Sequence, residues 1–305
     1  MAGNFVQLHN HTHYSLLDGA SKVPDLVKRV KELGMPAVGI TDHGNMHGAY
    51  ELWRAAVDSG VKPIIGIEAY VTPETARQDK TRVSWDTNWT PVPGHARNPD
   101  DVSGGGLITH LTMWAENDEG LVNLIKASSV ANLEGRVMRY PRMDKEVLST
   151  YSKGVIASSG CPSGIIQTRL RLGQFDEALR AAGEFQDIFG KDNFYIELMD
   201  HGLSIESKVT GDLLTIAKKL GAPLLATNDS HYVMEADKDA QDAMLCINSG
   251  ATLDDPNRFK FEGSGYYIKS AEEMRELFKD HPDACDNTLE IAERCNVIFD
   301  DHEDG

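Results

Sequence analysis

Near its start the chain reads Phe5-Val-Gln-Leu-His9-Asn-His11-Thr-His13-Tyr-Ser-Leu-Leu-Asp18-Gly19, an apolar run followed by three alternating histidines and an aspartate. Alternate side chains of a β-strand project to one face, so His9, His11 and His13 would lie together at the end of a first strand. Imidazole binds zinc and other transition ions, and the carboxylate of Asp18 suits harder cations such as manganese. The stretch therefore predicts a metal site; the alternative is a histidine-rich strand end on a solvated surface.

Outward from this stretch, short apolar runs alternate with helical patterns along almost the whole chain. This alternation is typical of β/α units around a parallel sheet. Further strands are expected at 37–40, 63–67, 107–113, 154–158, 194–198 and 223–226. Helices are expected at 23–33, 47–59, 120–132, 144–151, 165–172, 175–189, 206–220, 238–248, 271–278 and 285–295, with a short hairpin near 259–268.

Residues 71–106 interrupt this rhythm, because the segment is rich in Pro, Gly, Asn, Thr and Asp. Loops this long are uncommon and are usually functional or mobile, so an excursion over one mouth of the fold is expected. At the other end, Asp300-Asp-His-Glu-Asp304 has the composition of a solvated tail or the start of a linker.

Composition limits the classes of protein to which the chain could belong. Its formal net charge of −17 over 305 residues argues against a nucleic-acid binder with a broad basic face. It does not exclude a phosphate-handling enzyme, because bound divalent cations reverse the local field in an acidic pocket. Four cysteines without paired spacing indicate reduced thiols and a cytoplasmic location. No signal peptide or membrane span is expected from the apolar runs.

Nearly every expected strand ends in a residue that could bind metal. In a β/α barrel the parallel strands deliver their C-terminal ends to one face, which holds the active site, so these side chains would converge. They are His9 and His11, His43, Glu68, His110, Cys161, Glu197 or Asp200, and Asp229 with His231.

This set has more ligands than one four-coordinate ion can use, so it predicts two or three cations. A bridging carboxylate such as Glu68 could hold two of them roughly 4 Å apart, the spacing that clamps phosphoryl oxygens. Phosphoester hydrolysis is the chemistry that such a site favours. Hydrolysis of the deamidase type on a barrel scaffold is the alternative that the ligands leave open.

The motifs that carry these residues also resemble a known family. They are Leu8-His-Asn-His11, Tyr14-Ser-Leu-Leu-Asp-Gly19, Thr41-Asp-His-Gly-Asn-Met46, Gly66-Ile-Glu-Ala-Tyr70, Gly160-Cys-Pro-Ser-Gly164 and Thr227-Asn-Asp-Ser-His231. Together they are similar to the polymerase and histidinol phosphatase (PHP) domain, in the version at the amino terminus of bacterial replicative DNA polymerase III alpha subunits. The resemblance runs from about residue 5 to residue 295.

The resemblance implies an α/β fold, a distorted seven-stranded (β/α) barrel of the TIM type with its active site at the C-terminal ends of the strands. It implies a metal-dependent phosphoesterase domain over residues 1–285, with residues 286–305 starting a linker towards a polymerase region. The palm and its catalytic aspartates would lie further downstream, so no DNA synthesis is expected from this chain.

A trinuclear site of Zn, Mn or Fe ions is also implied. The resemblance places one ion with His9, His11, Glu68 and Asp229, a second with Glu68, His110 and Cys161, and a third with Asp18, His43 and His231. Asp18, Glu68 and His231 are the expected catalytic residues. His13 stands where related sequences often carry an acid, and Cys161 replaces the histidine of small-molecule phosphatases in the wider family.

The intact ligand set implies a proofreading 3′→5′ exonuclease that acts on a DNA 3′ end. The resemblance also implies a longer chain with a polymerase palm and thumb, and replisome partners such as the sliding clamp. Two alternatives are a silent scaffold that docks a separate proofreading subunit, and a small-molecule phosphatase. The basic and aromatic cluster of Arg136, Arg139, Tyr140 and Arg142 could contact the DNA backbone and stack a base, or form a solvated loop.

Overall fold

The computed structural model describes residues 4–86, 88, 90, 98, 100 and 105–299. Parts of the expected excursion (87, 89, 91–97, 99 and 101–104) and of the expected linker (300–305) lie outside these residues. The strands are β1 (Ala37–Ile40), β2 (Lys62–Val71), β3 (Thr109–Ala115), β4 (Arg142–Met143), β5 (Val155–Ser158), β6 (Phe194–Leu198) and β7 (Leu224–Ala226). The helices are α1 (Val23–Glu32), α2 (Ala49–Ser59), α3 (Asp118–Glu134), α4 (Lys145–Thr150), α5 (Ile165–Arg171), α6 (Phe175–Phe189), α7 (Ser204–Leu220), η1 (Glu235–Asp237), α8 (Lys238–Ser249), α9 (Ala271–Leu277) and α10 (Pro282–Arg294).

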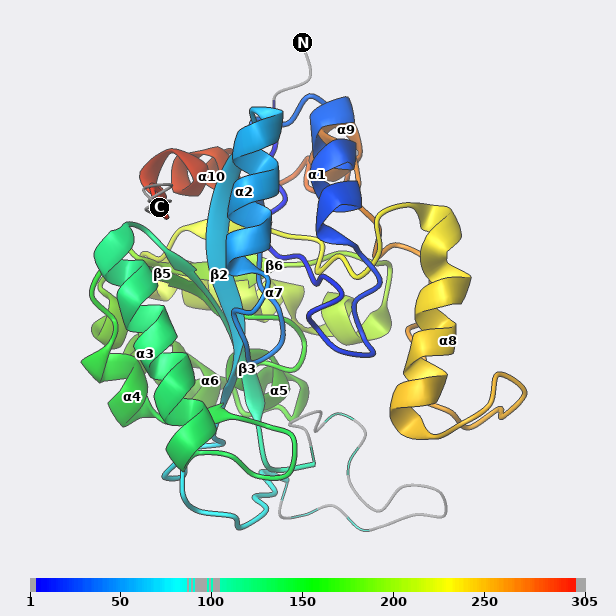
Figure 1. The fold of residues 1–305 in the computed structure, drawn as a ribbon. Helices are drawn as coiled ribbons and strands as arrows, with labels where there is room; N and C mark the ends of the chain where they lie inside the picture. The colour runs from blue at the N-terminus through cyan, green and yellow to red at the C-terminus, as the bar shows by residue number, and fades with distance from the viewer. Residues whose placement is uncertain are drawn as a thin grey trace.

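The strands form a curled sheet in the order β1-β2-β3-β5-β6-β7, with β4 beside β2 (Figure 1). The pairs β1–β2, β5–β6 and β6–β7 are parallel, but β3 runs antiparallel to both β2 and β5. The predicted α/β class is confirmed, whereas an all-parallel sheet is wrong at β3. Because β3 is reversed, its first residues lie at the edge where its neighbours have their last residues.

Residues 5–11 do not form a regular strand, although the sequence predicts one. Single parallel bridges pair Gln7 with Val38 of β1 and Asn10 with Ser230 after β7. Gly39 permits the close approach, because a Cβ atom there would lie 2.5 Å from the carbonyl oxygen of Leu8. The N-terminal segment therefore contacts both β1 and the chain after β7.

Amphipathic helices cover the sheet. In α1 a proline stands in the first turn, where its missing N–H costs no helical hydrogen bond, and Leu26, Val27 and Val30 are buried. Each such side chain contributes about 1.5–3 kcal/mol by leaving water. Helix α2 packs on β2, and α3 on β3 (Figure 1). Among the described helices, none combines the length and the hydrophobicity that a membrane span needs.

Two expectations near the C-terminal end are corrected. The boundary at 285/286 falls inside α10, and Ile291 and Ala292 of this helix pack with Val6 and Leu8 in a buried cluster. Residues 286–295 therefore belong to the folded unit rather than to a linker. The hairpin expected near 259–268 is absent, because these residues, all described, contain no strand.

Candidate metal centre

The nine side chains expected as metal ligands come together at one edge of the sheet. Glu68 lies within β2, and His110 is at the start of the reversed strand β3. The others lie on irregular segments: His9 and His11 in the N-terminal segment, Asp18 before α1, His43 after β1, Cys161 after β5, and Asp229 and His231 after β7. We call these nine residues the cluster.

Glu68 is at the middle of the cluster and is fully buried. Its Oε1 lies 3.5 Å from His9 Nε2 and 3.0 Å from His110 Nδ1. Its Oε2 lies 3.5 Å from His11 Nε2 and 2.6 Å from His43 Nδ1. Each oxygen of this carboxylate therefore faces two imidazole nitrogens.

A second carboxylate, Asp229, joins the same two N-terminal histidines. Its Oδ1 lies 3.3 Å from His9 Nε2 and 3.0 Å from His11 Nε2. The backbone of Asp229 has a φ of 44°, in the left-handed region that costs a non-glycine residue roughly 1–2 kcal/mol. The backbone is therefore strained at the residue whose carboxylate points into the cluster.

The remaining members lie on either side. Asp18 Oδ2 is 3.0 Å from His43 Nε2, and Asp18 Oδ1 is 3.8 Å from His231 Nε2. On the other side, Cys161 Sγ is 3.4 Å from His110 Nδ1. Three groups have ligand atoms within 4.8 Å of one another: His9, His11 and Asp229; His43, Glu68 and His110; and His11, His43 and His231.

These contacts are close, but most of them do not have hydrogen-bond geometry. Within the described structure, buried atoms without a hydrogen-bond partner include His9 Nε2, His11 Nε2, His43 Nδ1, Asp18 Oδ1, Asp229 Oδ1 and both oxygens of Glu68. Buried polar groups are almost always paired, since an unpaired one costs about 1–3 kcal/mol. Divalent cations among these atoms would satisfy them together, so the residues present fit a metal centre.

The family profile described as PHP domain matches residues 7–201. This chain belongs to the PHP domain family. DNA polymerase III subunit alpha of Mycobacterium leprae is 53% identical over 298 residues, which are 97% of this chain and 25% of that protein. The subunit of the same name from Saccharopolyspora erythraea is 55% identical over 297 residues, again 97% of this chain and 25% of that protein. The chain thus spans about a quarter of the length of these curated relatives.

Two solved structures also align with this chain, at low identity. A putative metal-dependent phosphoesterase from Bifidobacterium adolescentis aligns with 90% of this chain and 96% of its own, at 14% identity and a TM-score of 0.41. A two-domain protein from Bacteroides vulgatus that contains a predicted PHP-like metal-dependent phosphoesterase aligns with 97% of this chain and 72% of its own, at 11% identity and a TM-score of 0.42.

Glu197 in β6 orients the first histidine of the PHP domain. The sequence places it at a strand end without assigning it a role. Its Oε1 is 2.7 Å from His9 Nδ1 and accepts a 2.6 Å hydrogen bond from the Thr227 hydroxyl, and its Oε2 accepts one from the Ser158 hydroxyl. A carboxylate only accepts, so His9 carries a proton on Nδ1, and its Nε2 is turned towards Glu68 and Asp229.

A buried network similarly orients the second histidine. His11 Nδ1 is 2.9 Å from Ser15 Oγ, and this hydroxyl donates a 2.7 Å hydrogen bond to Asp42 Oδ1. Asp42 also accepts from the backbone N–H and the hydroxyl of Thr12. Neither Ser15 nor Asp42 was expected from the sequence, because their contacts with His11 depend on the fold.

Burial and neighbouring charges set the protonation of the cluster. Burial, reinforced by His43 and His231, lowers the pKa of His11 to about 3. Burial opposes ionisation of Asp18, but the neighbouring histidines outweigh it and lower the pKa of this carboxyl to about 2. Burial, together with Glu68 and Asp229, raises the pKa of the Cys161 thiol well above its ordinary value. The protein alone therefore presents a neutral His11, an ionised Asp18 and a protonated Cys161 at neutral pH.

The structure separates the four residues expected to contact DNA. Arg142 is fully buried, and its guanidinium donates to the carbonyl oxygens of Gly135, Leu107, Arg77 and Asp79. The expected role of Arg142 in binding DNA is therefore corrected: this side chain ties the segment before β3 to β4.

The other three remain near the cluster or the solvent. Arg136 and Arg139 are exposed, and Arg139 donates to the side chain of Asn248 on α8. The Tyr140 ring meets Tyr70 edge-on at 5.1 Å, and Tyr70 lies 6.0 Å from the ring of His43. Tyr140 therefore contacts the cluster through the ring of Tyr70. His13 stands where related sequences often carry an acid. Its Nε2 atom lies 4.0 Å from Oε2 of Glu51, and its side chain is 40% exposed.

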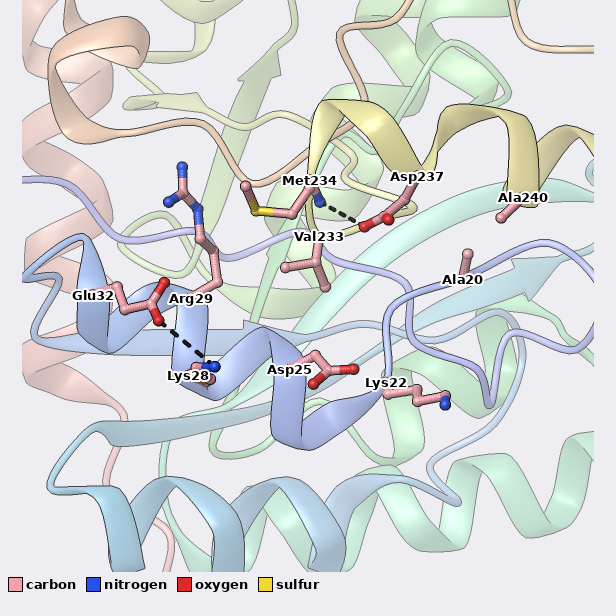
Figure 2. A pocket seen from close by; sticks show the side chains of 10 residues that line it. All are labelled: Ala20, Lys22, Asp25, Lys28, Arg29, Glu32, Val233, Met234, Asp237 and Ala240. Atoms are coloured by element: carbon pink, nitrogen blue, oxygen red, sulfur yellow. Dashed lines mark hydrogen bonds and ion pairs between the residues drawn. The ribbon is translucent and has the colours of Figure 1, made fainter.

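Figure 2 shows a cavity of about 370 Å³ between α1 and the segment that leads into α8. Its charged lining residues are three cations and three anions, and Lys28 pairs with Glu32 across one turn of α1 at 4.0 Å. None of the nine cluster residues lines it. The cavity therefore lies outside the candidate metal centre.

Proposed function

We propose that this PHP domain is a metal-dependent 3′→5′ exonuclease that hydrolyses the terminal phosphodiester of DNA. The observation that carries the proposal is the convergence of buried, unpaired ligand atoms from His9, His11, Asp18, His43, Glu68 and Asp229. The name of the relatives with 53–55% identity, DNA polymerase III subunit alpha, supports DNA as the substrate.

We assign the cluster to a trinuclear site of Zn, Mn or Fe ions. Glu68 would bridge two ions, one shared with His9, His11 and Asp229 and the other with His110 and Cys161. A third would be held by Asp18, His43 and His231. Such ions supply electrophilic stabilisation of the phosphoryl oxygens and lower the pKa of water. The bridges from residues 7 and 10 to both ends of the sheet support a closed, distorted β/α barrel around this site.

Asp18, Glu68 and His231 are proposed as the catalytic residues. Asp18 is 20% exposed at its side chain, more than the buried Glu68, so it faces the incoming substrate. With a pKa of about 2 it is ionised at neutral pH and can accept a hydrogen bond that orients the attacking water. As the oxygen of water bonds to phosphorus and the bond from phosphorus to the 3′ oxygen breaks, the water releases its proton to solvent and the leaving oxygen takes one up, while His231 would help to hold an ion beside the reacting group.

In the longer relatives the remaining three quarters of the chain would carry the rest of the polymerase. We propose that this PHP domain receives the DNA 3′ end from a palm and thumb in the same polypeptide, within a replisome that includes the sliding clamp. The nine ligand-competent residues favour an active domain over a silent scaffold.

Elemental analysis combined with a digestion assay tests the proposal. The purified chain should hold several Zn, Mn or Fe ions and should shorten a single-stranded oligonucleotide labelled at its 5′ end from the 3′ terminus. His9→Ala and Asp18→Asn should lose both metal and digestion, whereas His47→Ala, an exposed histidine outside the cluster, should keep both.

Two results would refute the exonuclease. Bound metal with turnover of a small phosphomonoester, but no digestion of DNA, would make the domain a phosphatase. Absence of both metal and hydrolysis would leave a scaffold.

A further inference from the structure

We propose that Phe259 and Phe261 form a stacking platform for the last unpaired bases of a DNA strand that enters the metal centre. This inference deepens the proposed exonuclease and depends on it for the identity of the substrate. The segment 258–263 follows α8, which lies on the right in Figure 1.

An aromatic path leads from the cluster to the solvent. The ring of His231 meets the ring of Phe261 edge-on at 4.6 Å, and Phe261 meets Phe259 edge-on at 5.9 Å. Phe261 also contacts Tyr266 at 4.7 Å, whereas Phe259 is 61% exposed. These rings offer a stacking surface that runs from a candidate catalytic histidine to the solvent.

The segment that carries these rings is fixed to the protein. Both terminal nitrogens of Arg258 lie 2.6 Å from the carboxylate oxygens of Asp242 on α8, a bidentate pair, and its Nε donates to the carbonyl oxygen of Leu253. Helix α8 is in turn joined to the cluster, because the buried Gln241 donates to the carbonyl oxygen of Asp18. The position of the rings relative to the metal centre is therefore defined by these hydrogen bonds.

A cavity of about 470 Å³ adjoins the platform, and Phe261 and Tyr232 are among its lining residues. Its volume is within the range of about 300–1,000 Å³ that is usual for small-molecule sites, so it can accept a nucleotide. The charges of the cavity nearly cancel: Lys238 and Lys260 accompany Asp239 and Glu262, and the Arg258 cation is paired with Asp242.

This balance of charge indicates which part of the substrate is recognised. A phosphate would gain little from such a lining, whereas the face of any base can stack on an aromatic ring, with little preference for sequence. In a duplex, paired bases already stack on each other, so only a frayed or single-stranded 3′ end could use the platform. The geometry thus selects an unpaired end, with its terminal phosphodiester beside His231.

The test uses the 305-residue chain and the substitutions Phe259→Ala, Phe261→Ala and Phe261→Trp. Leu253→Ala is the matched control, because Leu253 is an apolar residue of the same loop, is 56% exposed and has no ring on which a base could stack. Binding of a 5′-fluorescein oligothymidylate is measured by anisotropy, with Ca²⁺ in place of Mn²⁺ to prevent turnover. Hydrolysis of the same strand and of methyl p-nitrophenyl phosphate is measured with Mn²⁺.

Each alanine substitution should raise both Kd and KM for the strand about tenfold or more. Phe261→Trp and Leu253→Ala should remain near the wild-type values, and turnover of the small diester should not change in any variant. Unchanged Kd in the alanine variants would overturn the platform. Equal losses on the strand and the small diester would also overturn it, because they would show that the rings only support His231.

The two proposals fail in different ways. A wild-type chain that binds the strand through these rings without hydrolysing it would retain the platform and refute the exonuclease. A wild-type chain that digests the strand with no contribution from the rings would retain the exonuclease and refute the platform. A chain that neither binds nor digests the strand would refute both.

Discussion

Replacing Glu197 by glutamine should weaken metal binding while the domain stays folded. The buried carboxylate accepts hydrogen bonds from His9, Thr227 and Ser158, and a glutamine of the same shape has one oxygen and one NH₂ group in its place. The NH₂ group would face a donor. The preference for a proton on His9 Nδ1, and with it the basicity of Nε2, would therefore decrease.

The size of the effect follows from these contacts. Loss of a carboxylate that orients a ligand histidine typically costs about 10- to 100-fold in metal affinity, or roughly 1.4–2.7 kcal/mol. One mismatched buried donor should also lower the free energy of unfolding by about 1–3 kcal/mol. Both changes are large enough to measure and too small to unfold a domain of typical stability.

Competition with a chromophoric chelator gives the affinity for Mn²⁺ and Zn²⁺, and thermal unfolding followed by circular dichroism gives the stability. The matched control is Glu206→Gln, because Glu206 is also buried and its Oε1 lies 2.6 Å from Nδ1 of His201, a histidine outside the cluster. Glu206→Gln should lower stability without lowering metal affinity. Unchanged affinity in Glu197→Gln, or an equal loss in both variants, would refute the role assigned to Glu197.

Three further predictions concern metal, a buried cation and pH. Removing the metal with a chelator should lower the unfolding temperature by about 5–10 °C relative to protein with metal at 100 times its Kd, since metal binding at that concentration contributes about 2.7 kcal/mol to stability. Coincident melting curves with and without chelator would contradict the metal centre. Arg142→Ala should lower the free energy of unfolding by about 3 kcal/mol or more in denaturant titrations, since four carbonyl oxygens lose their donor. A folded variant that binds DNA less tightly than the wild type would instead show that Arg142 contacts DNA. Burial lowers the pKa of Lys269 to about 8, so the folded state loses a proton that the unfolded state keeps up to a pKa of about 10.4. The free energy of unfolding should therefore rise between pH 8 and 10 by up to about 1.4 kcal/mol per pH unit relative to Lys269→Met, and parallel pH profiles of the two proteins would disprove this contribution.

Sequence periodicity predicts the elements that pack locally. The predicted strands 37–40 and 194–198 coincide with β1 and β6, and the predicted helix 175–189 coincides with α6. The direction of β3 could not be predicted in this way, because alternation of side chains is the same in either direction of a strand. His110 nevertheless joins the cluster, since reversal of the strand brings its beginning to the edge where Glu68 lies.

The convergence of the candidate ligands could be predicted because their chemistry is visible in their residue types, and their role as ligands stays a prediction. The supporting residues could not be predicted, since a glutamate such as Glu197 has the same appearance in sequence whether it binds metal, orients a ligand or faces water. Arg142 shows the opposite error: a basic residue near aromatic ones suggests a nucleic-acid contact, but here the fold buries it against carbonyl oxygens. A hairpin was expected where Phe259 and Phe261 lie, because aromatic enrichment is a strand signal.

The bridge between Asn10 and Ser230 has a consequence for biosynthesis. His9 and His11 are synthesised more than two hundred positions before Asp229 and His231. At about 5–20 residues per second, His9 and His11 are present for ten seconds or more before Asp229 and His231 are synthesised. If the cluster is the proposed metal centre, its complete set of ligands would therefore exist only after residue 231 has been synthesised.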